Sequence, residues 1–102
     1  MEATTRQNTV TLPLKVSGKT HPGDLGAAIV ESIKQSRDRT TILEAIGPQS
    51  VNQAVKGIAV ARGYTSSQGW DLVSVPSFDN KEINGQETTT IRMIVKDISP
   101  LS

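Results

Sequence analysis

The setting of Lys19 is the one that most directly suggests binding chemistry. This lysine lies in the loop "VSGKTHPG", just before the expected start of a helix at Pro22. Free backbone N–H groups and the positive end of a helix dipole attract phosphate at such a position. A solvated lysine in a turn is the alternative interpretation. The loop is not a Walker loop, because "GKT" lacks the upstream glycine and the four-residue spacing.

A second set of polar side chains belongs to the stretch "IGPQSVNQAVKGIAVARGY". Lys56 and Arg62 are its two basic side chains, on a helix surface that is otherwise small and smooth. Such a surface allows close approach of a second copy of the chain or of a nucleic acid. The amide of Asn52 could bond to a nucleic-acid backbone or across a subunit interface, or simply face water. An interface role is favoured over base reading, because nothing in the sequence places a groove there.

Catalytic and metal-binding patterns are weak in this chain. His21 is the sole histidine and there is no cysteine, which excludes disulfides and thiolate metal sites. No nucleophile elbow is present, and the acidic residues near the C-terminal hairpin lack metal-ligand spacing. We therefore expect no enzyme activity, no metal and no cofactor.

The composition limits how the chain could bind nucleic acid. Its 102 residues suffice for one domain, and the formal charge is only +1, from 11 basic and 10 acidic residues. DNA-coating domains are usually plainly basic, so a nearly neutral chain must gather its basic residues on one face or bind weakly. Only 35% of residues are hydrophobic and only three are aromatic. This thin core favours oligomerisation as a source of further burial.

Targeting signals are not evident. No apolar run approaches the roughly 18 residues of a membrane span, and the N-terminus lacks the apolar core of a signal peptide. The sequence therefore predicts a cytoplasmic protein with no membrane partner.

The hydrophobic pattern predicts six elements in the order β-α-β-α-β-β. Capping-box spacing of Ser50 and Gln53 predicts the start of the second helix, and Gly63 its left-handed stop. "NG" at Asn84 and Gly85 predicts a hairpin turn within a polar connection. The expected ranges are a tail over 1–8, a strand over 9–17, a helix over 22–37, a strand over 40–47, a helix over 48–63, strands over 69–78 and 88–98 joined by the connection 79–87, and a tail over 99–102.

This order predicts an α+β domain over residues 9–98, a four-stranded mixed sheet with two helices on one face. Gly57 inside the second helix implies close packing, either against another copy or within the same chain. Trp70 and Phe78 could stack on bases, but their strand positions favour the core or a subunit interface.

The runs "EAIGPQSVNQAVKGIAVARGY", "GWDLVSVPSF" and "INGQETTTIRMIVK" closely resemble the stage V sporulation protein S family, a small bacterial family. The segment "LKVSGKTHPGDLGAAI" is similar to the first strand and turn of that family. The likeness extends from Leu14 to Lys96, whereas the front "MEATTRQNTVTLP" is longer than the family pattern.

The resemblance implies an Alba-like fold and a dimeric, nucleic-acid-binding protein. It implies phosphate contacts from the loop residues Ser17 and Lys19, from Lys56 and Arg62 on the second helix, and from Lys81 at the last hairpin. The hairpin departs from the basic Alba arm, because its lysine is set among three acidic residues, Asp79, Glu82 and Glu87.

The resemblance also supplies the functional expectation: a homo-oligomeric regulator in sporulation, a dimer or tetramer that binds DNA or RNA with weak sequence preference. A cytoplasmic location with association to the nucleoid accompanies this interpretation. The alternative is a protein-interaction module that keeps the fold without contacting nucleic acid. The acidic hairpin and the charge of +1 favour that alternative.

Overall fold

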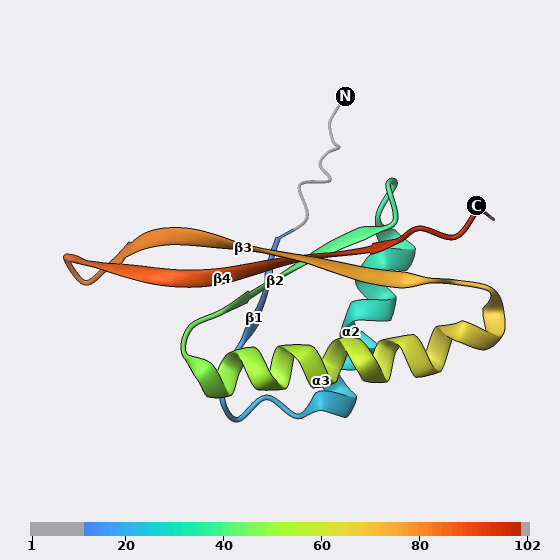
Figure 1. The fold of residues 1–102 in the computed structure, drawn as a ribbon, viewed down its shortest axis with the longest axis horizontal. Coiled ribbons are helices and arrows are strands. Elements are labelled where there is room, and N and C mark those ends of the chain that lie inside the picture. Colours follow the sequence, from blue (N-terminus) through green and yellow to red (C-terminus); the bar gives the residue numbers. More distant parts are fainter. Residues whose placement is uncertain (1–11, 101–102) are drawn as a thin grey trace.

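The computed structural model describes residues 12–100. Four strands form one sheet in the order β1-β2-β4-β3, in which β1 and β2 are parallel and the other neighbours antiparallel. This confirms the predicted α+β architecture with its mixed sheet (Figure 1). The elements are β1 (Leu14–Val16), α2 (Pro22–Gln35), β2 (Thr40–Ala45), α3 (Pro48–Thr65), the short 3₁₀ helix η1 (Ser66–Gln68), β3 (Leu72–Ile83) and β4 (Gln86–Asp97).

The core lies between one face of the sheet and both helices. Leu43 and Ala45 of β2 alternate with outward residues and are buried, as are Met93 and Val95 on the neighbouring β4. This alternation is what a strand with one covered face requires. The helices contribute apolar residues at helical spacing, namely Leu25, Ile29 and Ile33 from α2 and Ala54, Ile58 and Ala61 from α3.

The two helices approach each other unusually closely within the chain. A Cβ atom placed on Gly57 of α3 would lie 2.5 Å from Cδ2 of Leu25, and one on Gly26 would lie 2.6 Å from Cγ1 of Val60. Glycine is therefore needed at both crossing positions. Of the two explanations for Gly57, packing within the same chain is the one that this contact supports.

The predicted N-terminal cap of α3 is wrong. Gly47, with φ of 90°, precedes the helix and supplies no side-chain cap, whereas Ser50 is buried in the first turn. Gln53 donates from Nε2 to the carbonyl of Thr20 at 2.8 Å instead of closing a capping box. A glycine in an unusual conformation followed by Pro48 starts the helix without a side-chain oxygen.

The predicted end of α3 is also wrong. The helix continues through Gly63 to Thr65, whose Oγ1 donates to the carbonyl of Ala61 at 2.9 Å. The left-handed residue that ends this region is Gly69, with φ of 85°, after η1. A Cβ atom placed on Gly63 would have no neighbour within 4 Å, so packing does not require a glycine there. Only its position in the sequence suggested that the helix stops at this residue.

The β3–β4 hairpin confirms the predicted turn and corrects its length. Asn84 and Gly85 both have positive φ, 53° and 79°, as a two-residue hairpin turn requires. The strands continue through the polar connection as far as the pair Ile83 and Gln86, so that connection is strand rather than loop. The hairpin projects beyond the start of α3 (Figure 1).

The first strand is shorter than predicted among the described residues. β1 covers only Leu14–Val16, and the rest of the expected strand up to residue 11 lies outside the described residues, as does the expected tail over 1–8. Pro13 precedes β1 and has no N–H to donate to a ladder.

An ion pair joins the end of the sheet to the loop before β2. Arg39 donates from Nε to Oδ2 of Asp97 at 2.7 Å, and its guanidinium lies 4.3 Å from the ring centroid of Trp70. The backbone N–H groups of Asp71 and Ser99 also donate to Asp97. Burial alone would raise the pKa of Asp97, but these donors outweigh it and lower the pKa to about 2.

Candidate nucleic-acid interface

The loop after β1 is held by its own hydrogen bonds. Ser17 accepts from the backbone N–H of Lys19 at 3.1 Å, and Thr20 accepts from the N–H of Ser17 at 2.8 Å. His21 caps α2, because its Nδ1 accepts from the N–H of Gly23 at 3.1 Å. The backbone N–H groups expected to form a phosphate cradle are thus partly used within the loop, whereas the Lys19 side chain is exposed.

This loop packs against the first turns of α3. A Cβ on Gly18 would lie 2.8 Å from Oε1 of Gln49, and Gln53 bonds to Thr20 as described above. The contacts fix the loop relative to the helix. Gln53, which the sequence interpreted as a cap, is the residue that makes this connection.

Four of the six predicted site residues therefore lie on the loop and the first half of α3. Asn52 and Lys56 are exposed on the helix and four residues apart, so their side chains are neighbours on one helix face. We call these two residues, together with Ser17 and Lys19, the loop–α3 surface. Neither of its lysines forms an ion pair among the described residues.

Arg62 does not join that surface. Its guanidinium donates to Oδ1 of Asp71 at 3.1 Å and to the carbonyl of Leu72. Half of its side chain stays exposed, but its charge is balanced within the chain. The structure thus uses Arg62 to connect the end of α3 to the start of β3.

Lys81 is likewise occupied within the chain. Its Nζ lies 2.6 Å from Oε2 of Glu44, a largely buried carboxylate on β2. The lysine reaches from the hairpin across the sheet face that carries no helix. Its neighbour on that face, Lys15 of β1, was not predicted as a site residue, although the strand alternation places it opposite the core-facing Val16.

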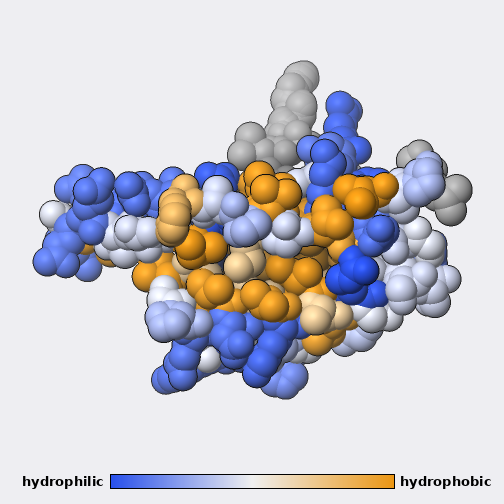
Figure 2. Space-filling model, viewed as in Figure 1, coloured by the Kyte–Doolittle hydropathy of each residue, from blue (hydrophilic) through white to orange (hydrophobic). Residues whose placement is uncertain are grey.

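An apolar groove runs between α3 and β3. It holds about 240 Å³ and is lined by Val55, Ile58, Ser74, Pro76 and Met93. Figure 2 shows apolar side chains gathered between α3 and the hairpin strands. Phe78, at 78% exposure on β3, lies farther along the same edge strand, so it does not belong to the core of the described chain. We call this feature the α3–β3 groove.

Other types of site find no support in residues 12–100. That part of the chain contains no group of three or more His, Cys, Asp or Glu residues placed to hold a metal ion. None of its helices is long and apolar enough to cross a membrane.

A comparison with known protein families gives one match. A family model described as Stage V sporulation protein S (SpoVS) matches residues 12–98. The match includes every helix and strand of the structure and all six predicted site residues.

Proposed function

We propose that this sporulation-related protein, which belongs to the stage V sporulation protein S family, is a homo-oligomeric regulator that binds nucleic acid and has no catalytic activity. The observation that carries this proposal is the loop–α3 surface. Lys19 and Lys56 are exposed there and form no ion pair among the described residues, so both are available to phosphate.

The fixed loop supports the same proposal. Because Gln53 and Gly18 hold the loop against α3, the side chains of Ser17, Lys19 and Lys56 project from one rigid framework. Contacts from lysine ammonium and serine hydroxyl groups to phosphate position a nucleic acid without reading its sequence. We expect weak sequence preference and strong dependence of affinity on salt.

Oligomerisation would raise the affinity of this surface for nucleic acid. One subunit offers two lysines on this surface and a formal charge of only +1. The α3–β3 groove is an apolar surface that a second copy could cover, including the exposed Val55 and Phe78. Two linked copies double the phosphate contacts and raise affinity beyond that of one surface.

The direct test is a salt titration of binding to fluorescent duplex DNA, duplex RNA and single strands, combined with the molar mass in solution. We expect a molar mass of at least a dimer, and affinity that falls log-linearly with salt. Phe78→Glu should lower the molar mass, whereas Ser77→Glu, on the opposite face of the same strand, should leave it unchanged. Absence of binding to every probe at low salt would contradict the proposal.

A second candidate function is a protein-interaction module. It is favoured by the ion pairs of Arg62 with Asp71 and of Lys81 with Glu44, which occupy two of the six predicted site residues within the chain. Pull-down from lysate with and without nuclease separates the two candidates. Partners retained after nuclease treatment, from a protein that binds none of the purified nucleic acids, would favour the second.

The proposed function includes a location. A nucleic-acid-binding regulator of this kind acts in the cytoplasm and, if DNA is its ligand, at the nucleoid. Microscopy of a fluorescent fusion in the native host, with DNA staining, tests this directly.

A further inference from the structure

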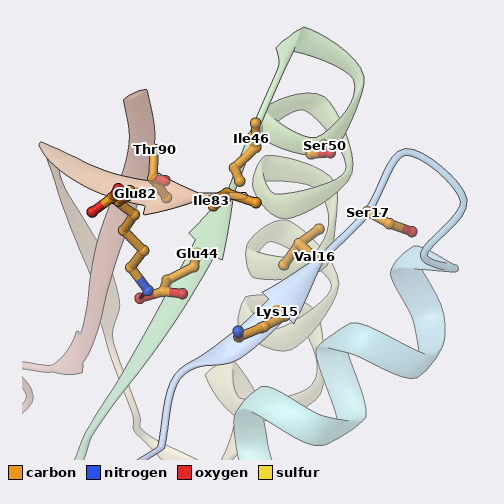
Figure 3. A pocket seen from close by; sticks show the side chains of 10 residues that line it. Lys15, Val16, Ser17, Glu44, Ile46, Ser50, Glu82, Ile83 and Thr90 are labelled. Atoms are coloured by element: carbon orange, nitrogen blue, oxygen red, sulfur yellow. Dashed lines mark hydrogen bonds and ion pairs between the residues drawn. The ribbon is translucent and has the colours of Figure 1, made fainter. Parts of the chain in front are cut away.

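A half-open cavity of about 480 Å³ lies between the hairpin and the ends of β1 and β2. Its volume falls in the range of ordinary small-molecule pockets. Figure 3 shows its side chains converging from β1, β2, α3 and β4. The polar side chains that line it are Lys15, Ser17, Glu44, Ser50, Lys81, Glu82 and Thr90.

Thr90 is the first observation that points to a ligand. This residue is 1% exposed, and its Oγ1 has no hydrogen-bond partner among the described residues. Buried hydroxyl groups are as a rule hydrogen-bonded. In Figure 3 its side chain points from β4 toward the space that Ile46 and Ile83 border. The hydroxyl can therefore donate to or accept from a polar group that enters the cavity.

Glu44 is the second observation, independent of the first. Its carboxylate is largely buried, and only Oε2 is bonded, to Lys81 at 2.6 Å. No residue among those described donates to Oε1. A buried carboxylate needs further donors to compensate for its desolvation. Oε1 is thus an acceptor for an N–H group, such as the exocyclic amino group of cytosine.

The cavity also offers a positive side. Lys15 is exposed, forms no ion pair among the described residues, and points in Figure 3 to the side of the sheet where Glu44 lies. Ser50 brings the first turn of α3 to the cavity, and the N-cap Gly47 gives that turn no side-chain partner. An ammonium group, a hydroxyl and a helix N-terminus together attract a phosphate.

Apolar side chains border the rest of the cavity, beyond Lys15 and Glu44, which are side-by-side partners in the β1–β2 register. Ile46, which directly follows β2, and Ile83, at the end of β3, are both exposed at the cavity, and Val16 also lines it. Aliphatic side chains of this kind can contact the faces of a planar ring. The lining thus combines acceptors for an amino group, an ammonium group beside them and an apolar wall.

We propose that this cavity binds one nucleotide unit whose base carries an exocyclic amino group, with Glu44 and Thr90 at the base and Ser50 with the first turn of α3 at the phosphate. The unit is either a free nucleotide or an unpaired residue of a strand, and the experiments below distinguish the two. This site adjoins the loop–α3 surface, since Ser17 also lines the cavity, but it uses neither Lys19 nor Lys56.

The test is calorimetric titration of the full chain with cytidine and uridine 5′-monophosphates. At the C4 position of the base, cytidine carries an amino group and uridine a carbonyl. We expect the cytidine nucleotide to bind at least about fivefold more tightly, because at the C4 position it presents an amino group to Glu44 where uridine presents a carbonyl oxygen. Equal affinities, or no binding of either at millimolar concentration, would overturn the proposal. Inorganic phosphate alone should bind more weakly than the cytidine nucleotide, and equal binding would also overturn it.

Two variants separate ligand recognition from folding. Glu44→Gln places a donor at the base end, so it should reduce or reverse the preference for cytidine over uridine. Thr90→Val should weaken cytidine nucleotide binding severalfold, while Thr89→Val, an exposed neighbour on β4, should not. Thermal melts of each variant check the fold. An unchanged preference in Glu44→Gln that still melts cooperatively would contradict the assigned role.

Two further comparisons identify the source of the nucleotide and keep the proposals apart. If Thr90→Val also weakens binding of a single-stranded cytidine oligonucleotide, the site accepts a residue of a strand; if only the mononucleotide is affected, the free nucleotide is the ligand. The double variant Lys19→Ala with Lys56→Ala should leave mononucleotide affinity unchanged. The chain could therefore bind the mononucleotide without binding duplexes, or bind duplexes without binding the mononucleotide, and each outcome would test only one of the two proposals.

Discussion

Two sets of basic side chains, at different ends of the molecule, are used differently. At the loop–α3 surface, Lys19 and Lys56 are exposed and form no ion pair among the described residues. At the other end, Arg39 and Arg62 are paired with Asp97 and Asp71. The difference teaches that residue type alone does not identify a binding residue, since a cation already balanced by a carboxylate contributes less to a ligand. We therefore expect changes at the paired end to alter stability, and changes at the unpaired end to alter binding.

The largest stability effect should come from Asp97→Ala. This change leaves Arg39 and the two backbone N–H groups that bond to Asp97 without their acceptor. Breaking a buried pair on one side costs about 3 kcal/mol of unfolding free energy. Urea denaturation measures it. The control Asp79→Ala breaks the looser pair with Arg92, at 3.6 Å, and should cost less than about 1 kcal/mol. Equal costs would remove the special role of Asp97.

The pH dependence of stability tests the same cluster without mutation. Asp97 has its pKa lowered from 3.8 to about 2, so the folded state binds its proton less readily than the unfolded state. The resulting stabilisation is present above pH 4 and is lost as the pH falls toward 2. Its size is about 2 kcal/mol. Denaturation at pH 5 and pH 2.5 should show this loss in the native chain, and a smaller loss in Asp97→Ala.

The smallest expected effect is that of Arg62→Ala. The pair with Asp71 is half exposed on both sides, so its loss should cost less than about 1 kcal/mol of stability. Because its charge is balanced within the chain, we also expect no change in the salt dependence of nucleic-acid binding. A clear fall in the salt slope for Arg62→Ala would show that the arginine leaves Asp71 to contact phosphate, and would weaken the comparison of the two ends.

The sequence predicted the fold well because periodicity and turn chemistry determine it locally. The alternation in β4 and the Asn84–Gly85 turn each require one structure. The ends of α3 were mispredicted, because Ser50 and Gly63 fit cap patterns while Gly47, Pro48 and Gly69 set the actual limits. Local patterns do not show which of two competing terminators the packed chain uses.

The candidate site was only partly predictable. Lys19 and Lys56 could be found from the loop and helix patterns, and the family resemblance added Ser17. That Arg62 meets Asp71 depends on the path of the chain through η1, and that Lys81 meets Glu44 depends on strand order. The pairing of residues distant in sequence is a property of the tertiary fold, so no motif could have shown it.

The most direct test of the account is the salt slope of duplex binding for three proteins: the native chain, Lys19→Ala with Lys56→Ala, and Lys34→Ala with Arg37→Ala. The two double variants remove the same charge, but Lys34 lies in the last turn of α2 and Arg37 just beyond it, at the end of the helix away from the loop. We predict that the first lowers the slope by about one unit per lysine removed and weakens unrelated sequences equally. The second should leave the slope within error. Equal slopes for the two variants would contradict the claim that the unpaired lysines of the loop–α3 surface contact phosphate.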